Sequence, residues 1–336
     1  MSERDITPGD LIGYAITQPW ATLTIGAVVA LVAFAFSMPR AARPASAYDD
    51  AANARYAPER RTIGATAVAV VALFLADHFV RGYALNMNGA IAWWRYAAPL
   101  FVAFLGTAAL LAFICTTGSG APQHPVVGAA RRTWLTFAPR ARAVAAGVVV
   151  LLLAATAVLA GLLSSVDVYG NYTYLEIPIP NAPSVDPIRH WFFGWAYGGP
   201  VLVALVALVA MAVACLHANA ARPFMRPETV VAEQNARRGI ASGIVHVATA
   251  SALLSLAGAW RLIADAGATT RLSIEGDGRL EVYEILWRGS EIATVLGWLA
   301  PAAEVVAFAL LLLATRHLRN ARIADTAPDA AVAVAS

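Results

Sequence analysis

Ionisable groups inside long apolar stretches are the features of this sequence that could carry chemistry. Glu304 lies near the middle of an apolar stretch over residues 292–315, three residues after Pro301. Charges at membrane depth are rare and usually functional, and a proline leaves a nearby backbone carbonyl without its hydrogen bond. Glu304 is therefore predicted to carry a proton or to coordinate a cation. The alternative is a protonated side chain that is hydrogen-bonded to Ser251 or Ser255.

A second ionisable group lies toward one end of an earlier apolar stretch, over residues 62–82. Asp77 and Arg81 are four residues apart, so they share a helix face and can form an ion pair, whereas His78 points elsewhere. Asp77 and His78 are further candidates for an intramembrane proton or ion site. Alternatively, the ion pair only anchors the end of the helix.

The same end of the apolar stretches is predicted to hold a ligand site. Residues at similar depth on different stretches would form its walls, and a pair of arginines there would suit an anionic ligand. Its candidate charged residues are Arg81, Arg95, Arg261 and Asp265.

Tryptophans also gather at this end. A groove with aromatic walls would explain them, with Trp191, Trp195 and Trp287 as candidate ligand-binding residues. The alternative is the interfacial belt of aromatic side chains that membrane proteins commonly have at both surfaces. Trp134 is the only tryptophan at the opposite end. A belt alone should be more even, so this distribution favours the groove.

The histidines and cysteines do not indicate a cofactor. His78 and His246 are predicted to differ in depth by roughly 15 Å, too much for the two ligands of one haem. Several residues near the opposite end could bind a soft metal, but their spacing matches no ligand pattern. Neither a catalytic set nor a metal site nor a cofactor is therefore predicted. The residues considered for the soft metal are Cys115, Met211, Cys215, His217 and His246.

The composition indicates a membrane protein. Hydrophobic residues make up 59% and charged residues 13% of the 336-residue chain, whereas soluble proteins have about 25% charged residues. All 24 basic residues are arginines, and the absence of lysine excludes a retinal Schiff base, pyridoxal phosphate chemistry and a P-loop. The arginines are spread over the chain, so nucleic acid is not a predicted partner. Arginine without lysine, together with abundant alanine, is typical of a GC-rich bacterial genome.

Seven apolar stretches reach the length of about 20 residues that a transmembrane helix needs. The predicted fold is an all-α multi-pass bundle of seven transmembrane helices in one domain, residues 1–322, followed by a disordered tail over 323–336. In the alternative, the first stretch lies in the membrane interface and six helices span. The predicted spans are 18–38, 62–82, 98–117, 142–164, 198–218, 240–263 and 292–315.

The arginines indicate the orientation of these helices. Sixteen fall in the segments after the first, third, fifth and seventh stretches, and eight fall in the other segments. Because cytoplasmic segments are the richer in basic residues, the N-terminus is predicted outside and the C-terminus inside a bacterial cell membrane. The cytoplasmic loops are expected to be solvated connectors, with Pro223 and Pro227 on either side of a turn.

Two loops on the predicted outer side are long enough to fold. In residues 266–290, alternating apolar residues flank a Gly-Asp-Gly turn at 276–278, a pattern typical of a β-hairpin. Residues 165–197 could supply an edge strand that ends before Pro178. Together the two loops are predicted to form a small β cap over the outer mouth of the bundle.

Three classes of function are compatible with this sequence. The favoured one is a non-enzymatic membrane protein that binds a small ligand or a partner subunit on its outer face, as a sensor or accessory component. The second is a proton-coupled transporter that uses Glu304, against which an odd number of helices and the lack of a visible repeat argue. The third is a membrane redox or metal-binding protein, which would need convergent His, Asp or Cys side chains.

Overall fold

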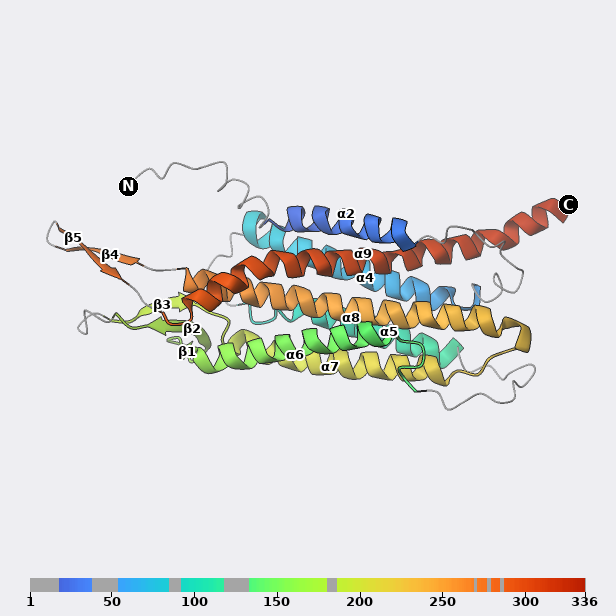
Figure 1. The fold of residues 1–336 in the computed structure, drawn as a ribbon, viewed down its shortest axis with the longest axis horizontal. Coiled ribbons are helices and arrows are strands. Elements are labelled where there is room, and N and C mark those ends of the chain that lie inside the picture. The colour runs from blue at the N-terminus through green and yellow to red at the C-terminus, as the bar shows by residue number, and fades with distance from the viewer. Residues whose placement is uncertain are drawn as a thin grey trace.

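The computed structural model shows a long helical bundle with short strands at one end, which we call the strand end; the other is the far end (Figure 1). It describes residues 18–37, 54–84, 92–117, 133–179, 186–268, 271–276, 279–284 and 287–335. Within these residues, six helices are long and apolar enough to cross a membrane. They are α4 (Ala57–Phe79), α5 (Ala98–Thr117), α6 (Arg140–Leu163), α7 (Trp195–Ala221), α8 (Val230–Gly267) and α9 (Ser290–Ala335).

Helix α8 forms the centre of the bundle. Its apolar part is 94% buried within the protein, whereas the apolar part of α6 is only 17% buried. α8 packs against α4, α5, α6, α7 and α9, and its many alanine, glycine and serine residues allow the close approach that is typical of membrane bundles. Large apolar side chains such as Leu151 and Leu162 of α6 face outward instead. Such a surface requires lipid around it, so the protein is membrane-embedded.

A further apolar helix, α2 (Pro19–Ser37), runs along α9 (Figure 1). Thr22 donates a hydrogen bond of 3.1 Å to Glu304, and four residues further along both helices Gly26 lies against Phe308. The two helices therefore run in the same direction. Nineteen residues extend over roughly 28 Å at 1.5 Å per residue, close to the thickness of the hydrocarbon core.

Replacing Gly26 with leucine is expected to destabilise the contact between α2 and α9. A Cβ atom at this position would lie 2.8 Å from the Cβ of Phe308 and 3.0 Å from the carbonyl oxygen of Val305, and overpacking of this kind costs about 1–3 kcal/mol. Thermal unfolding in detergent measures the effect. The control is Gly147→Leu on α6, where an added Cβ meets nothing within 4 Å; equal effects of both changes would contradict the packing described here.

The strands form two separate antiparallel sheets. The first consists of β1 (Ser165–Val166), β2 (Tyr172–Ile177) and β3 (Ile188–Trp191), in that order. β2 ends before Pro178 as predicted, but the prediction of an edge strand is wrong because β2 is the central strand. β1 reaches it through a turn, in which Asp167 accepts hydrogen bonds from the backbone N–H groups of Tyr169 and Asn171. Desolvation alone would raise the pKa of Asp167. The hydrogen bonds that its carboxylate accepts outweigh this effect, so the pKa lies below its ordinary value.

The second sheet is the predicted hairpin. β4 (Arg271–Gly276) pairs with β5 (Arg279–Glu284) in a register that joins Gly276 to Arg279. The two loops do not share a sheet, but the ring of Trp287, just after β5, contacts the ring of Phe192, just after β3, at 6.2 Å between centroids. The turn residues 277 and 278 lie outside the described residues.

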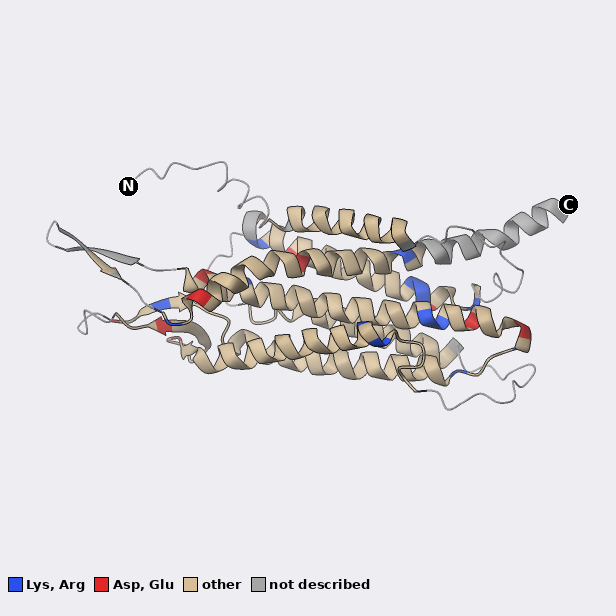
Figure 2. Ribbon diagram, in the orientation of Figure 1, with Lys and Arg blue, Asp and Glu red and all other residues tan. Residues whose placement is uncertain are grey.

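Charged residues lie mainly near the two ends of the bundle, as Figure 2 shows. At the far end, Arg222 and Arg237 were expected in solvated loops or at their edges. That prediction is wrong, because only 5% of Arg222 and 0% of Arg237 is exposed. Arg222 forms a 2.6 Å ion pair with Glu59 of α4, and Arg237 forms a 3.3 Å ion pair with Glu233 one turn earlier in α8.

Arg237 also forms hydrogen bonds with the backbone just after α7. Its guanidinium donates to the carbonyl oxygens of Arg222 at 2.7 Å and Pro223 at 2.8 Å, and its Nε donates to the Tyr56 hydroxyl at 3.1 Å. The last carbonyls of a helix lack partners within the helix, and a cation near them is favourable. The turn between α7 and α8 is thus held by a buried network of charges. Helix α9 continues to Ala335, through the segment expected to be disordered.

Candidate functional site

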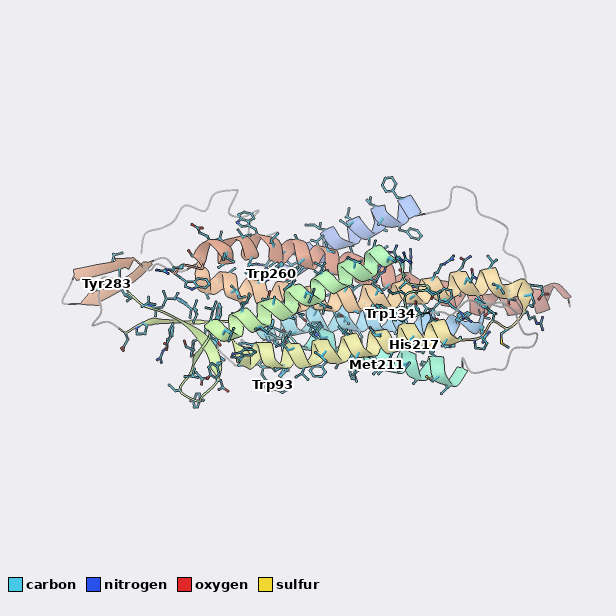
Figure 3. The ribbon with its side chains drawn as sticks, turned by 60° about the horizontal axis from the view of Figure 1, so that its bottom comes forward. Trp93, Trp134, Met211, His217, Trp260 and Tyr283 are labelled. Atoms are coloured by element: carbon cyan, nitrogen blue, oxygen red, sulfur yellow. The ribbon has the colours of Figure 1, made fainter. Side chains whose placement is uncertain are left out.

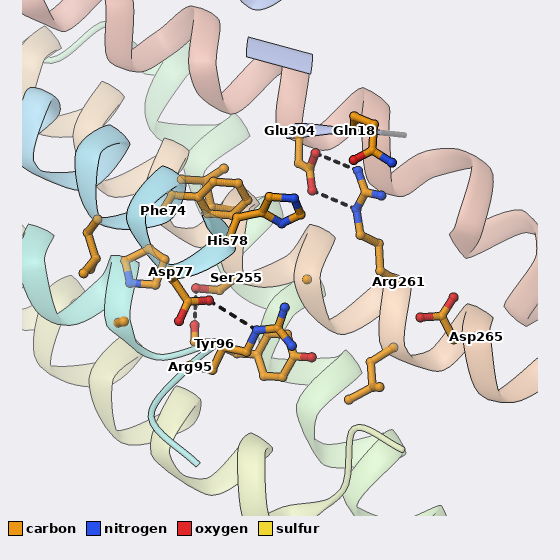
Figure 4. Close-up of a pocket in the computed structure, with 16 residues that line it drawn as sticks. Gln18, Phe74, Asp77, His78, Arg95, Tyr96, Ser255, Arg261, Asp265 and Glu304 are labelled. Carbon is orange, nitrogen blue, oxygen red and sulfur yellow. Dashed lines mark hydrogen bonds and ion pairs between the residues drawn. The ribbon is translucent and has the colours of Figure 1, made fainter. Parts of the chain in front are cut away.

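A polar pocket of about 350 Å³ lies in the strand-end half of the bundle (Figure 4). The N-terminal side of α2 and the helices α4, α5, α8 and α9 all contribute to its wall. Aliphatic and aromatic side chains such as Leu73 and Phe74 line part of it. The ionisable residues of the wall, apart from Tyr96, are Asp77, His78, Arg95, Arg261, Asp265 and Glu304.

Arg261 and Glu304 form the most ordered part of this wall. The Nε and Nη2 atoms of Arg261 donate to the two carboxylate oxygens of Glu304 at 2.8 and 2.7 Å. Glu304 is 1% exposed, and its side chain also accepts the hydrogen bond from Thr22. Bidentate pairs of this kind fix both side chains in one orientation. The predicted alternative, a hydrogen bond from Glu304 to Ser251 or Ser255, is not formed.

The second ion pair is the predicted one between Asp77 and Arg81, with 2.9 Å between Oδ1 and Nε. The other carboxylate oxygen of Asp77 lies 3.4 Å from Nε of Arg95, so one carboxylate joins two arginines. Arg81 also lies over the ring of Trp94, and it is 8% exposed and does not line the pocket. Arg95 faces the pocket and lies over the ring of Tyr96.

Tyr96 is held at the base of α5 by close contacts with α8. Gly258 leaves room for its ring, because a Cβ atom there would lie 2.7 Å from Cδ1 of the tyrosine. Ser255 donates a 2.7 Å hydrogen bond to the backbone oxygen of Tyr96. Burial raises the pKa of the Tyr96 hydroxyl, so this group remains a neutral hydrogen-bond donor at physiological pH.

Two ionisable side chains of the pocket remain unpaired. Among the described residues, neither His78 nor Asp265 has a hydrogen-bond or ion-pair partner. Asp265 is exposed, and it lies close enough to Arg261 and Arg95 for their charges to act on it. A bound molecule could therefore meet a carboxylate and an imidazole as well as the two arginines.

The three tryptophans predicted to line a groove do not line this pocket. Trp191 packs on Tyr174 across the first sheet, with ring centroids 5.0 Å apart. Trp195 lies where Gly161 leaves space at the end of α6, and Trp287 contacts Phe192. The aromatic wall of the pocket is instead made by Phe74 and Tyr96.

Residues considered for a soft metal do not converge. Figure 3 shows Met211 and His217 in the far-end half of the bundle, away from Trp93 at the strand end. Within the described parts of the chain, no three His, Cys, Asp or Glu side chains are placed to hold a metal ion. The pocket combines fixed ion pairs with side chains that have no partner among the described residues.

Comparison of the chain with protein-family models, with curated protein sequences and with solved structures found no match.

Proposed function

We propose that the chain is a non-enzymatic membrane protein that binds a small water-soluble ligand carrying an anionic group. The observation that supports this most is that the two arginines that line the pocket, Arg95 and Arg261, use only some of their N–H donors within the protein. Asp77 lies 3.4 Å from Nε of Arg95, and Glu304 accepts hydrogen bonds from Nε and Nη2 of Arg261. Neither Nη atom of Arg95 nor Nη1 of Arg261 donates a hydrogen bond to another described residue. A guanidinium has five N–H donors, so several remain for a ligand.

The carboxylates would act as supports for this binding rather than as competitors. They already hold Arg95 and Arg261 in fixed orientations, which lowers the entropy lost when a ligand binds. The volume of about 350 Å³ is at the lower end of the range of about 300–1,000 Å³ for ligand pockets. A small carboxylate, phosphate or sulfonate fits it, and Asp265 could receive an amino group of the same molecule.

Thermal unfolding with a panel of small compounds tests this function. A ligand at 100 times its Kd stabilises the folded state by about 2.7 kcal/mol, so compounds with an anionic group should raise the unfolding temperature more than simple amines do. The change Arg95→Gln should abolish the shift. The matched control is Arg189→Gln, which removes an arginine that is 52% exposed on the first sheet. Equal stabilisation by amines, or an unchanged shift in Arg95→Gln, would contradict the proposal.

A proton-coupled transporter remains the second proposal, because Glu304 is almost fully buried beside the pocket. An anionic substrate that took over Arg261 would leave the Glu304 carboxylate without its partner, and a buried unpaired carboxylate binds a proton. Substrate and proton would then move together. Once a ligand is known, the test is proton uptake by vesicles that contain the protein; transport that stays proton-coupled in Glu304→Gln would exclude this mechanism.

Binding of a partner subunit is a further form of the proposed function. The turn between β1 and β2 exposes two apolar side chains, Val168 at 84% and Tyr169 at 85%. Purification in mild detergent followed by mass spectrometry tests this: a partner in stoichiometric amount that Tyr169→Ser removes would support it, and recovery of the chain alone would oppose it.

We propose a seven-span arrangement in a bacterial cell membrane, with the strand end outside. The direction of α2 along α9 and the greater number of arginines toward the far end support it. Cysteines placed one at a time at Tyr169 and Arg238, in a variant without native cysteines, would be labelled in intact cells by a membrane-impermeant reagent only at position 169. Labelling at position 238 alone would show that the far end, not the strand end, is outside.

A further inference from the structure

A second cavity of about 440 Å³ lies between α2 and α9 toward the far end. Unlike the polar pocket, it is lined almost entirely by apolar side chains. Ala27 and Ala30 leave the space, and Leu31, with 68% of its surface exposed, lies at the open side toward lipid. We call it the α2–α9 groove; its lining is Ala27, Ala30, Leu31, Phe34, Leu312, Leu313, Thr315 and Arg316.

The groove has a definite polar end. Arg316 is the first charged residue of α9 after Glu304, and it directly follows the apolar residues 305–314 and Thr315. Its guanidinium is thus at the level where lipid headgroups lie, and Leu312 and Leu313 are about one turn deeper. Arginines at such positions extend toward the membrane surface.

Arg316 is not neutralised within the described part of the protein. No carboxylate there forms an ion pair with it, and the charge that acts on it is the like charge of Arg142 of α6. Arg142 donates a hydrogen bond to the neutral hydroxyl of Ser242 and also has no carboxylate partner among the described residues. The guanidinium of Arg316 therefore lies at the end of the apolar groove without a carboxylate partner among the described residues, and the like charge of Arg142 acts on it from α6. This arrangement favours a ligand with an anion on an apolar tail.

We propose that the α2–α9 groove binds an anionic phospholipid. One acyl chain occupies the space beside Ala27 and Ala30, and the phosphate pairs with Arg316. A phospholipid with a zwitterionic headgroup fits the same space but brings a cation toward the arginines, so it binds less well. The groove is separate from the polar pocket, and this proposal does not depend on a ligand there.

Native mass spectrometry of the full chain with equal amounts of phosphatidylglycerol and phosphatidylcholine, with matched acyl chains, tests the proposal. The wild-type protein should retain the anionic lipid in preference. Arg316→Gln should reduce that preference about tenfold, the loss expected for one charge-assisted contact. Arg238→Gln is the control, because Arg238 is an exposed arginine on α8 that does not line the groove.

A third variant separates the groove from simple attraction of charges. Ala27→Leu fills the groove without changing charge, and it should lower retention of both lipids while the thermal unfolding temperature shows that the protein remains folded. Lack of lipid preference in the wild type would overturn the proposal. Equal effects of Arg316→Gln and Arg238→Gln, or full lipid retention in Ala27→Leu, would also overturn it.

Discussion

The change Arg237→Ala is expected to lower the free energy of unfolding by about 3–5 kcal/mol, the range for breaking a buried ion pair by removing one partner. The arginine is 0% exposed, and its loss leaves the buried carboxylate of Glu233 with Arg55, at 3.5 Å, as its ion-pair partner among the described residues. It also leaves the carbonyl groups of Arg222 and Pro223 without the donors that now satisfy them. The packing of the guanidinium over the ring of Phe224, 4.4 Å from its centroid, is lost as well.

The neighbouring residue provides the control for this prediction. Arg238 is exposed, and its contact within the described residues is a 3.4 Å hydrogen bond to Asn235. Arg238→Ala should therefore change stability by no more than about 0.5 kcal/mol. Unfolding of the purified protein in detergent, followed by tryptophan fluorescence, measures both variants. Similar losses in the two variants would show that net positive charge, rather than the buried network, stabilises the far end.

Removal of Arg261 should cause the second largest loss in the free energy of unfolding. Removal of Glu304 as well should restore part of that loss. Arg261→Leu leaves Glu304 buried without its partner and is expected to cost about 3 kcal/mol. The double change Arg261→Leu with Glu304→Leu removes both charges, and such replacements of buried pairs are often neutral. The double variant should therefore be more stable than the single Arg261→Leu variant.

The first sheet offers a matched ion pair for comparison. Arg189 and Glu176 are 2.9 Å apart, almost the same separation as in the buried pair, but their side chains are 52% and 33% exposed. Water and ions screen such a pair, so its coupling energy in a double-mutant cycle should be at most about 1 kcal/mol. A coupling between Arg261 and Glu304 that is no larger would show that water reaches Glu304 as freely as it reaches the surface.

The bounds of the helices, the ion pair within α4 and the following η1 (Val80–Ala84), and the hairpin were predictable, because each depends on the pattern of residues within a short segment of the chain. The long apolar helices begin and end within a few residues of the predicted spans, except where α8 and α9 extend further. The Asp77–Arg81 pair follows from a spacing of four residues on one helix. The pairing of β4 with β5 follows from the Gly-Asp-Gly sequence between alternating apolar residues, and the end of β2 follows from Pro178.

Features that depend on contacts between distant segments were not predictable in the same way. Arg261 and Glu304 were both singled out, but they are 43 residues apart, and nothing in the sequence selects this partner over Ser251 or Ser255. The burial of Arg237 was missed because arginine near a helix end usually faces water. A weak signal was present, since Glu233 and Arg237 are spaced one helical turn apart, as Asp77 and Arg81 are.

The most direct test of the account is the access of small ions to the polar pocket. Ala98 is a half-buried residue of its wall, and Ala98→Cys in a variant with Cys115 and Cys215 replaced by serine places one thiol there. An anionic methanethiosulfonate reagent should modify this thiol faster than a cationic reagent of similar size, because Arg95 and Arg261 keep N–H donors that can meet an anion, whereas the carboxylates of Asp77 and Glu304 already face these arginines. The added change Arg95→Gln should reduce the difference. A thiol that does not react, or that reacts faster with the cation, would contradict the account of an anion-binding pocket.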